Sequence, residues 1–130
     1  MCGIVAYLGN KQALPVILSG LKKLEYRGYD SAGVALMFDE DIAVRKTAGK
    51  VIDLENLLGS NGYDKNASIG FGHTRWATHG EPNNKNAHPI FDENNEIVVI
   101  HNGIIENYAV LKTRLEREGY HFMTDTDTQC

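Results

Sequence analysis

The sequence has 130 residues, enough for one domain with a single core, and its 42% hydrophobic and 23% charged residues are ordinary for a globular protein. Its formal net charge of −4 argues against nucleic acid or an anionic membrane as the main partner, and no apolar run approaches the ~20 residues of a membrane-spanning helix. There is no signal peptide pattern, and the two cysteines, Cys2 and Cys130, are too few for a disulfide scaffold, so we expect a reducing, cytoplasmic environment.

Hydrophobic patterns along the chain predict a mixture of strands and helices. The first half predicts a buried strand over 3–8, a helix from about 14 to 26, a hairpin of strands over 32–38 and 42–47, a short helix over 51–58 and a loop over 59–66. The second half predicts a strand over 68–73, a polar loop over 74–86, a buried strand over 97–100, a helix from about 108 to 118 and a short strand over 120–123. Thr126 and Gln129 match a capping box, which predicts that a further helix begins there, and we therefore expect the chain to be part of a longer protein.

The first chemically distinctive residue is Cys2, directly after the initiator methionine. Removal of that methionine would give one residue both a thiol nucleophile and a free α-amine, whose ordinary pKa of about 7.7–8.0 suits a general base. The predicted strand over 3–8 would place the thiol at the mouth of a rigid element. A cysteine at this position is by itself weak evidence, because most such cysteines have no catalytic role.

Several other residues could complete a site around such a nucleophile. Asn102 and Gly103 could donate an amide N–H and a backbone N–H to a developing oxyanion, although an Asn-Gly pair is also a common turn. Arg75 could hold a carboxylate with its guanidinium, or be merely solvated. Asp127 could bind an ammonium group, or cap a helix, and Trp76 could be a lid or part of the core. Together these groups suit an α-amino acid with a reactive side chain.

Metal and dinucleotide sites find little support in the sequence. No C-x-x-C or H-x-x-x-H pair occurs among the five histidines and two cysteines. Gly70-Phe71-Gly72 begins a dinucleotide-binding fingerprint but lacks its third glycine and the helix that should follow. We therefore expect no metal and no cofactor.

Four segments of the sequence resemble the class II glutamine amidotransferase domain. They are Met1 to Val5 (MCGIV), Leu24 to Ala35 (LEYRGYDSAGVA), Gly72 to Pro82 (GHTRWATHGEP) and His101 to Tyr108 (HNGIIENY). The two central segments resemble in particular the branch of the family that passes ammonia to fructose 6-phosphate. The segments spread over essentially the whole chain, and together they are highly specific.

The resemblance implies an α+β fold of the N-terminal-nucleophile hydrolase type, an αββα sandwich in which two antiparallel sheets lie between helical layers. Residues 1–130 would be about the first half of this glutaminase domain. The rest of the domain and the sugar-isomerase domains would lie outside the chain. Where many relatives have glutamate, this sequence has Gln129, and we expect a modest effect because glutamine also completes a capping box.

The resemblance also implies the chemistry of the nucleophile. After removal of the initiator methionine, Cys2 attacks the side-chain amide of glutamine with its own α-amine as base, a γ-glutamyl thioester forms, and water releases glutamate. Asn102 and the N–H of Gly103 form the oxyanion hole. Arg27 and Gly28 line the surroundings of the thiol.

Further residues are assigned to substrate binding by the same resemblance. Arg75 holds the α-carboxylate of glutamine, with Thr78 and His79 in support, and Asp127 takes the α-amino group. Trp76 lies in a loop that closes over glutamine and gates the passage of ammonia.

The partners implied are glutamine and, through the isomerase half, fructose 6-phosphate, which becomes glucosamine 6-phosphate in a homo-oligomeric parent protein. Neither nucleic acid nor a membrane is expected. The alternative is that residues 1–130 alone form a non-catalytic binding or structural piece of this fold. A retained Met1 would also leave the α-amine on the wrong residue, so that Cys2 would lack its base.

Overall fold

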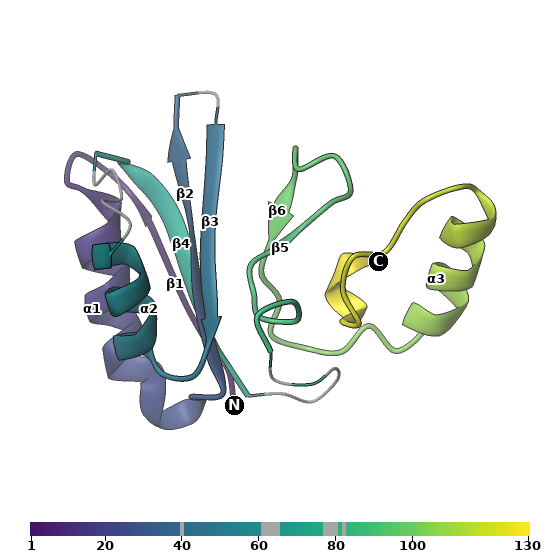
Figure 1. Ribbon diagram of the computed structural model, residues 1–130, viewed down its shortest axis with the longest axis horizontal. Coiled ribbons are helices and arrows are strands. Elements are labelled where there is room, and N and C mark those ends of the chain that lie inside the picture. Colours follow the sequence, from purple (N-terminus) through teal and green to yellow (C-terminus); the bar gives the residue numbers. More distant parts are fainter. Residues whose placement is uncertain (40, 61–65, 77–80, 82) are drawn as a thin grey trace.

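The computed structural model describes residues 1–39, 41–60, 66–76, 81 and 83–130. Figure 1 shows two parts: a larger sheet covered by two helices, and a smaller C-terminal part with a two-stranded sheet and a third helix. The N-terminus lies where the two parts meet. The antiparallel sheets and the helices make an α+β fold, as expected from the sequence.

The larger part is an antiparallel sheet with the strand order β1-β4-β2-β3. The strands are β1 (Gly3–Leu8), β4 (Ile69–Arg75), β2 (Ser31–Phe38) and β3 (Asp41–Ala48), which confirms the four strands predicted in this region. β1 was expected to be buried, but it is buried on the helix side only, and Ile4 and Leu8 are exposed. Gly3 lies opposite Thr74 and Ser31 opposite Arg75, so the start of β1 and the end of β4 share one end of the sheet. Thr74 and Arg75, which were expected in a loop, are instead the last residues of β4, because they pair with these neighbours.

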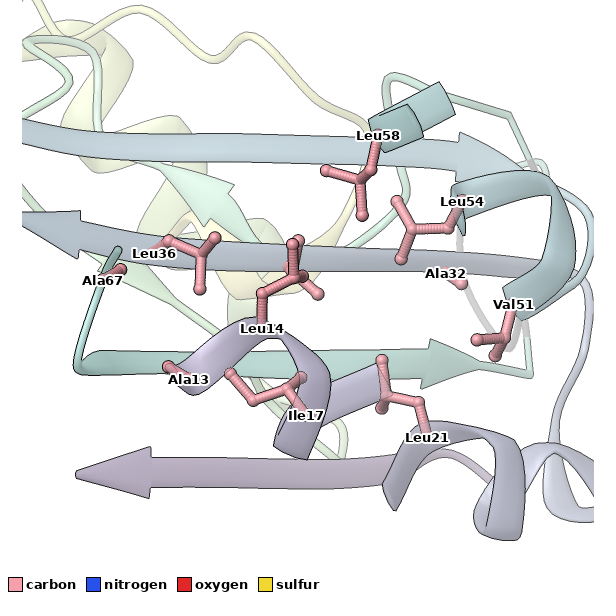
Figure 2. Packing of buried hydrophobic residues seen from close by; sticks show 11 residues of the cluster. Ala13, Leu14, Ile17, Leu21, Ala32, Leu36, Val51, Leu54, Leu58 and Ala67 are labelled. Carbon is pink, nitrogen blue, oxygen red and sulfur yellow. The ribbon is translucent and has the colours of Figure 1, made fainter. Parts of the chain in front are cut away.

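Two helices, α1 (Ala13–Leu24) and α2 (Val51–Ser60), cover one face of this sheet (Figure 1) and confirm the two helices predicted there. After α1 a single 3-10 turn, η1 (Glu25–Arg27), leads to Gly28. Figure 2 shows Leu14 and Ile17 of α1 pointing toward the sheet, where they are buried in one cluster with Leu36 of β2 and Leu54 of α2. Burying each such side chain stabilises the fold by about 1.5–3 kcal/mol, so this cluster anchors both helices.

The smaller part stands on the sheet face opposite to α1 and α2 (Figure 1). Its elements are β5 (Ile90–Phe91), β6 (Val98–Val99), α3 (Tyr108–Arg117) and the 3-10 turn η2 (Asp127–Gln129). Lys46 of β3 joins the two parts, because its Nζ donates to the carbonyl oxygens of Ala87 (2.8 Å) and Pro89 (3.1 Å). Burial lowers the pKa of Lys46 to about 8.

The strand predicted over 97–100 is shorter and more exposed than expected. Only Val98–Val99 is paired, with the two residues of β5. Ile97 is 63% exposed and Val99 is 41% exposed. An apolar run becomes a buried strand only when a partner of similar length lies beside it, so the prediction of a buried strand is wrong.

No strand forms over 120–123, although the structure describes these residues in full. Their backbone N–H groups are used otherwise: that of Tyr120 donates to Leu115 at the end of α3, and that of His121 donates to Glu93 Oε2 at 2.8 Å. The strand prediction is therefore wrong, whereas the helix predicted before it is confirmed as α3.

The capping box expected at Thr126 and Gln129 does not form. The element that begins there is the single turn η2, and Thr126 makes no side-chain hydrogen bond to its N–H groups. Gln129 Oε1 instead accepts the backbone N–H of Thr124 at 2.7 Å. This turn buries Asp127, which is 6% exposed.

Gly33 lies where the smaller part touches the sheet. A β-carbon added to it would collide with the carbonyl oxygen of His88 and lie 2.8 Å from the β-carbon of Lys46. Because neither atom can move aside alone, Gly33→Ala is expected to lower the free energy of unfolding by about 3 kcal/mol. Urea unfolding followed by circular dichroism measures this change.

Gly59→Ala is the matched control for this substitution. Among the described residues nothing lies within 4 Å of a β-carbon added to Gly59, on the exposed side of α2. Alanine there should stabilise the helix by about 0.5–1 kcal/mol. Equal stabilities of the two variants would contradict the close contact at Gly33.

Candidate active site

A cavity of about 560 Å³ opens where the end of the larger sheet meets the smaller part. Its wall combines Cys2 before β1, Arg75 at the end of β4, Asn102 and Gly103 after β6, and Asp127 in η2. All five were singled out from the sequence, and the fold brings them together from distant parts of the chain. Cys2 and Arg75 lie close together because β1 begins and β4 ends at the same end of the sheet, where residues face the same opening.

The thiol of Cys2 is fixed against the residue that follows β4. Gly3 pairs with Thr74, so the β1–β4 ladder brings Cys2 beside the end of β4, next to Trp76 in the chain. The backbone N–H of Trp76 donates to Cys2 Sγ at 3.2 Å, and Sγ lies 3.5 Å from the carbonyl oxygen of Trp76. The sulfur is thus held at the cavity wall by backbone groups of a rigid strand end.

Arg27 and Gly28 lie beside the N-terminus. The α-amine of Met1 donates to the carbonyl oxygen of Arg27 at 2.6 Å, and Arg27 lines the cavity. A β-carbon on Gly28 would lie 2.9 Å from the carbonyl oxygens of Met1 and Arg75, so only glycine permits this close approach of three segments. Met1 itself is 78% exposed, so its loss would remove little packing.

Asn102 lies beside Cys2 with both ends of its side-chain amide engaged. Oδ1 lies 2.7 Å from His73 Nε2, and Nδ2 donates to the carbonyl oxygen of Cys2 at 3.2 Å. Gly103 shares the cavity wall, and a β-carbon there would lie 2.6 Å from His101 Nε2. A side-chain amide donor and a glycine therefore share the cavity wall with the thiol, where a developing oxyanion would need donors.

Arg75 and Asp127 supply opposite charges to the same cavity. Arg75 is 5% exposed, and its Nη1 donates to the carbonyl oxygen of Glu81 at 3.4 Å. Asp127 Oδ2 accepts the backbone N–H of Ile105 at 2.7 Å. A cation and an anion fixed on one cavity wall suit a zwitterionic ligand such as an α-amino acid.

Trp76 stands at the rim of the cavity. It is 48% exposed, and its ring makes an edge-to-face contact with Tyr29 at 5.7 Å. This position does not fit the alternative that Trp76 is part of the core. Thr78 and His79, the other two residues assigned to substrate binding, lie outside the described residues.

Three histidines on the cavity wall were not singled out from the sequence as site residues: His73, His88 and His101. The rings of His73 and His88 stack with their centroids 4.6 Å apart. His88 Nδ1 accepts the backbone N–H of His101 at 3.3 Å, and its Nε2 lies 3.4 Å from Thr128 Oγ1. The available signal was position: His73 lies two residues before Arg75 on one strand, so both side chains point to the same face.

Burial keeps this pair of histidines neutral. It lowers the pKa of His73 to about 4 and that of His88 to about 3. In the unfolded chain both rings bind a proton near pH 6.5, so below that pH the unfolded state binds more protons than the folded state. The free energy of unfolding should therefore fall by on the order of 3 kcal/mol for each histidine as the pH drops from about 6.5 to about 4.

Chemical denaturation at a series of pH values measures this loss. His121→Gln is the control, because His121 is exposed outside the cavity and its replacement should leave the pH dependence unchanged. A free energy of unfolding that stays constant between pH 7 and pH 5 would contradict the burial of neutral histidines.

Among the described residues, no group of three or more histidine, cysteine, aspartate or glutamate side chains could hold a metal ion. None of the helices in that part of the chain has the length and hydrophobicity that a membrane span requires.

Comparison with solved structures gives the same architecture. The chain is similar to glutamine phosphoribosylpyrophosphate amidotransferase from B. subtilis, with 27% identity and a TM-score of 0.80 over 99% of this chain and 28% of that one. It is also similar to an allosteric regulatory enzyme of purine biosynthesis, with 28% identity and a TM-score of 0.84 over the same shares.

Comparison of sequences identifies closer relatives. Glutamine–fructose-6-phosphate aminotransferases (isomerizing) from Bacteroides thetaiotaomicron and Clostridium acetobutylicum are 55% and 56% identical over 99% of this chain. The chain spans about a fifth of their length, since it covers 21% of each. A family model described as a glutamine amidotransferase domain matches residues 59–130. The chain therefore belongs to the glutamine amidotransferase domain family.

Proposed function

We propose that this chain carries the glutamine-hydrolysing site of an amidotransferase, which releases ammonia and glutamate from glutamine. The observation that supports this most directly is the cavity in which a thiol, an amide donor, a buried cation and a buried anion meet. They are Cys2, Asn102, Arg75 and Asp127. Family membership supports the same reaction.

The proposed reaction has two steps. Once Met1 is removed, the thiol of Cys2 attacks the side-chain carbonyl carbon of glutamine, and the α-amine of Cys2 passes the thiol proton to the departing ammonia as the C–N bond breaks. Water then attacks the γ-glutamyl thioester, with the amine again as base, and releases glutamate and the thiol. The Asn102 amide and the Gly103 N–H stabilise the oxyanion in both steps.

Glutamine would be held by its two charged groups. Arg75 binds the α-carboxylate, with Thr78 and His79 in support, and Asp127 binds the α-ammonium. Trp76, half-exposed at the rim, would cover the bound substrate and exclude water.

The acceptor of the ammonia is proposed from the relatives, whose name specifies fructose 6-phosphate. A sugar-isomerase half elsewhere in the full-length protein would make glucosamine 6-phosphate from it. We propose a homo-oligomeric cytoplasmic enzyme, since the reaction needs a reduced thiol, and neither nucleic acid nor a membrane as partner.

Two measurements on the full-length gene product test this function. Mass spectrometry should show an N-terminus shortened by one methionine, and glutamine should be converted to glutamate. A glutamine-mimicking electrophile should label Cys2 and leave Cys130, which lies outside the cavity, unlabelled. Retention of Met1 with no glutamate release would overturn the proposal.

We expect residues 1–130 alone to have little glutaminase activity. The sheet face opposite the helices exposes apolar side chains of β1 and β4, with Leu8 77% and Ile4 40% exposed, and α3 buries none of its residues. The smaller part, which carries half of the site, is therefore weakly anchored. Glutamate release by the isolated chain at the rate of the full-length protein would contradict this.

A further inference from the structure

His73 points from the middle of the β1–β4–β2 sheet into the wall of the cavity. It is 1% exposed, and its Nε2 lies 2.7 Å from Asn102 Oδ1. Asn102 in turn donates to the carbonyl oxygen of Cys2. A buried strand residue is thus connected to the nucleophile through the amide that would stabilise the oxyanion.

The protonation of His73 follows from its partner. An amide oxygen only accepts hydrogen bonds, so His73 Nε2 carries the proton and donates it. His73 Nδ1 is buried and has no hydrogen-bond partner among the described residues, and a proton there would be a buried charge. His73 is therefore a fixed neutral donor at physiological pH, consistent with a pKa that burial lowers to about 4.

This donor permits only one orientation of the Asn102 amide. With Oδ1 held by His73, the Nδ2 group faces Cys2, where one N–H reaches the Cys2 carbonyl oxygen. Since an amide nitrogen carries two hydrogens, the second is left to point at a substrate oxygen. A flipped amide would place N–H against N–H at His73 and oxygen against oxygen at Cys2.

The orientation of the His73 ring is itself held. His88 stacks on it at 4.6 Å with an angle of 25° between the planes. His88 is fixed by the backbone N–H of His101, which follows β6, and by Thr128, which lies in η2. Rotation of the His73 ring would break this stack as well as the hydrogen bond to Asn102.

We propose that His73 is a positioning residue, which sets the direction of the Asn102 amide and so assembles the oxyanion hole. This inference rests on the proposed glutamine hydrolysis. Its role differs from a general packing role in one respect: it acts only through Asn102. Glutamine binding, which depends on Arg75 and Asp127, should be unaffected.

A double-mutant cycle in the full-length protein tests this. His73→Ala is expected to lower the kcat of glutamate release by about 10- to 100-fold with little change in KM. Complete loss of one oxyanion donor lowers kcat by about 10²- to 10³-fold, and here the donor is misdirected rather than removed. In an Asn102→Ala background, His73→Ala should lower kcat by less than about threefold, because the amide that His73 orients is already absent. His73→Gln, whose amide N–H can reach the position of Nε2, should recover most of the rate.

The control reaction is alkylation of Cys2 by iodoacetamide, which attacks a saturated carbon and forms no oxyanion. Its rate should be the same in His73→Ala as in the unsubstituted protein. A fall in alkylation parallel to kcat, multiplicative losses in the cycle, or no rescue by His73→Gln would overturn the proposal.

If His73→Ala does not fold, nitrogen NMR of the unsubstituted protein labelled in histidine decides. A proton on Nε2 of His73 supports the proposal, and a proton on Nδ1 overturns it. Failure of the unsubstituted protein to release glutamate would instead contradict the proposed function. The variants test only the role of His73, so the two failures can be told apart.

Discussion

Cys2→Ala is expected to lower glutamate release by the full-length protein by about four to six orders of magnitude, because Cys2 carries the only thiol among the described residues that line the cavity. The thiol, the proposed nucleophile, is held at the cavity wall by the backbone of Trp76, and alanine removes only the sulfur. Glutamine should still bind, since Arg75 and Asp127 are untouched. Release is measured by coupled assay of glutamate, and binding by calorimetry.

Cys130→Ala is the matched control for this substitution. Cys130 is the other free cysteine of the chain, lies outside the cavity and contacts the carbonyl oxygen of Tyr108 at 3.6 Å. Its replacement should leave glutamate release unchanged. Normal turnover by Cys2→Ala, or equal losses in the two variants, would exclude thiol catalysis at the N-terminus.

Local sequence patterns were sufficient for the larger part of the fold. The apolar run of β1 and the helical spacing in α1 are each complete within a short segment, and Val5 and Tyr7 of β1 pack against the cluster that buries the apolar side of α1. The strand predictions over 97–100 and 120–123 failed for a reason that lies outside those segments. A strand exists only with a partner, and partner availability is a property of the whole chain that no local pattern carries.

The site was predictable in its parts but not in its connections. Cys2 and Asn102 are a hundred residues apart, and composition alone left their roles open until the resemblance joined them. The Trp76 N–H at Cys2 depends on strand register, which places the end of β4 beside the N-terminus. The His73 contact to Asn102 depends on how the smaller part meets the sheet. His73 was missed because spacing along the chain tests histidines only as metal ligands, and the resemblance assigned a role in substrate binding to His79 alone.

Asp127→Asn is expected to raise the KM for glutamine by about 30- to 150-fold, since a charge-assisted hydrogen bond in a buried site contributes about 2–3 kcal/mol. The substitution keeps the size of the side chain. Asp127 Oδ2 accepts the N–H of Ile105, so the new amide must keep its oxygen there. Its NH2 group would then face the place of the ammonium, where two donors repel. Steady-state kinetics should show KM changing more than kcat.

Asp125→Asn separates this effect from a general loss of negative charge. Asp125 lies two residues away, outside the cavity, in a 3.4 Å ion pair with Lys85, and its side chain is 61% exposed. An exposed pair of this kind contributes at most about 1 kcal/mol, so KM should change by less than about threefold. Equal effects at the two positions would mean that long-range charge attracts glutamine. A KM increase confined to Asp127→Asn would instead assign the ammonium contact to that carboxylate, because only there does the Ile105 N–H fix the direction of the substituted amide.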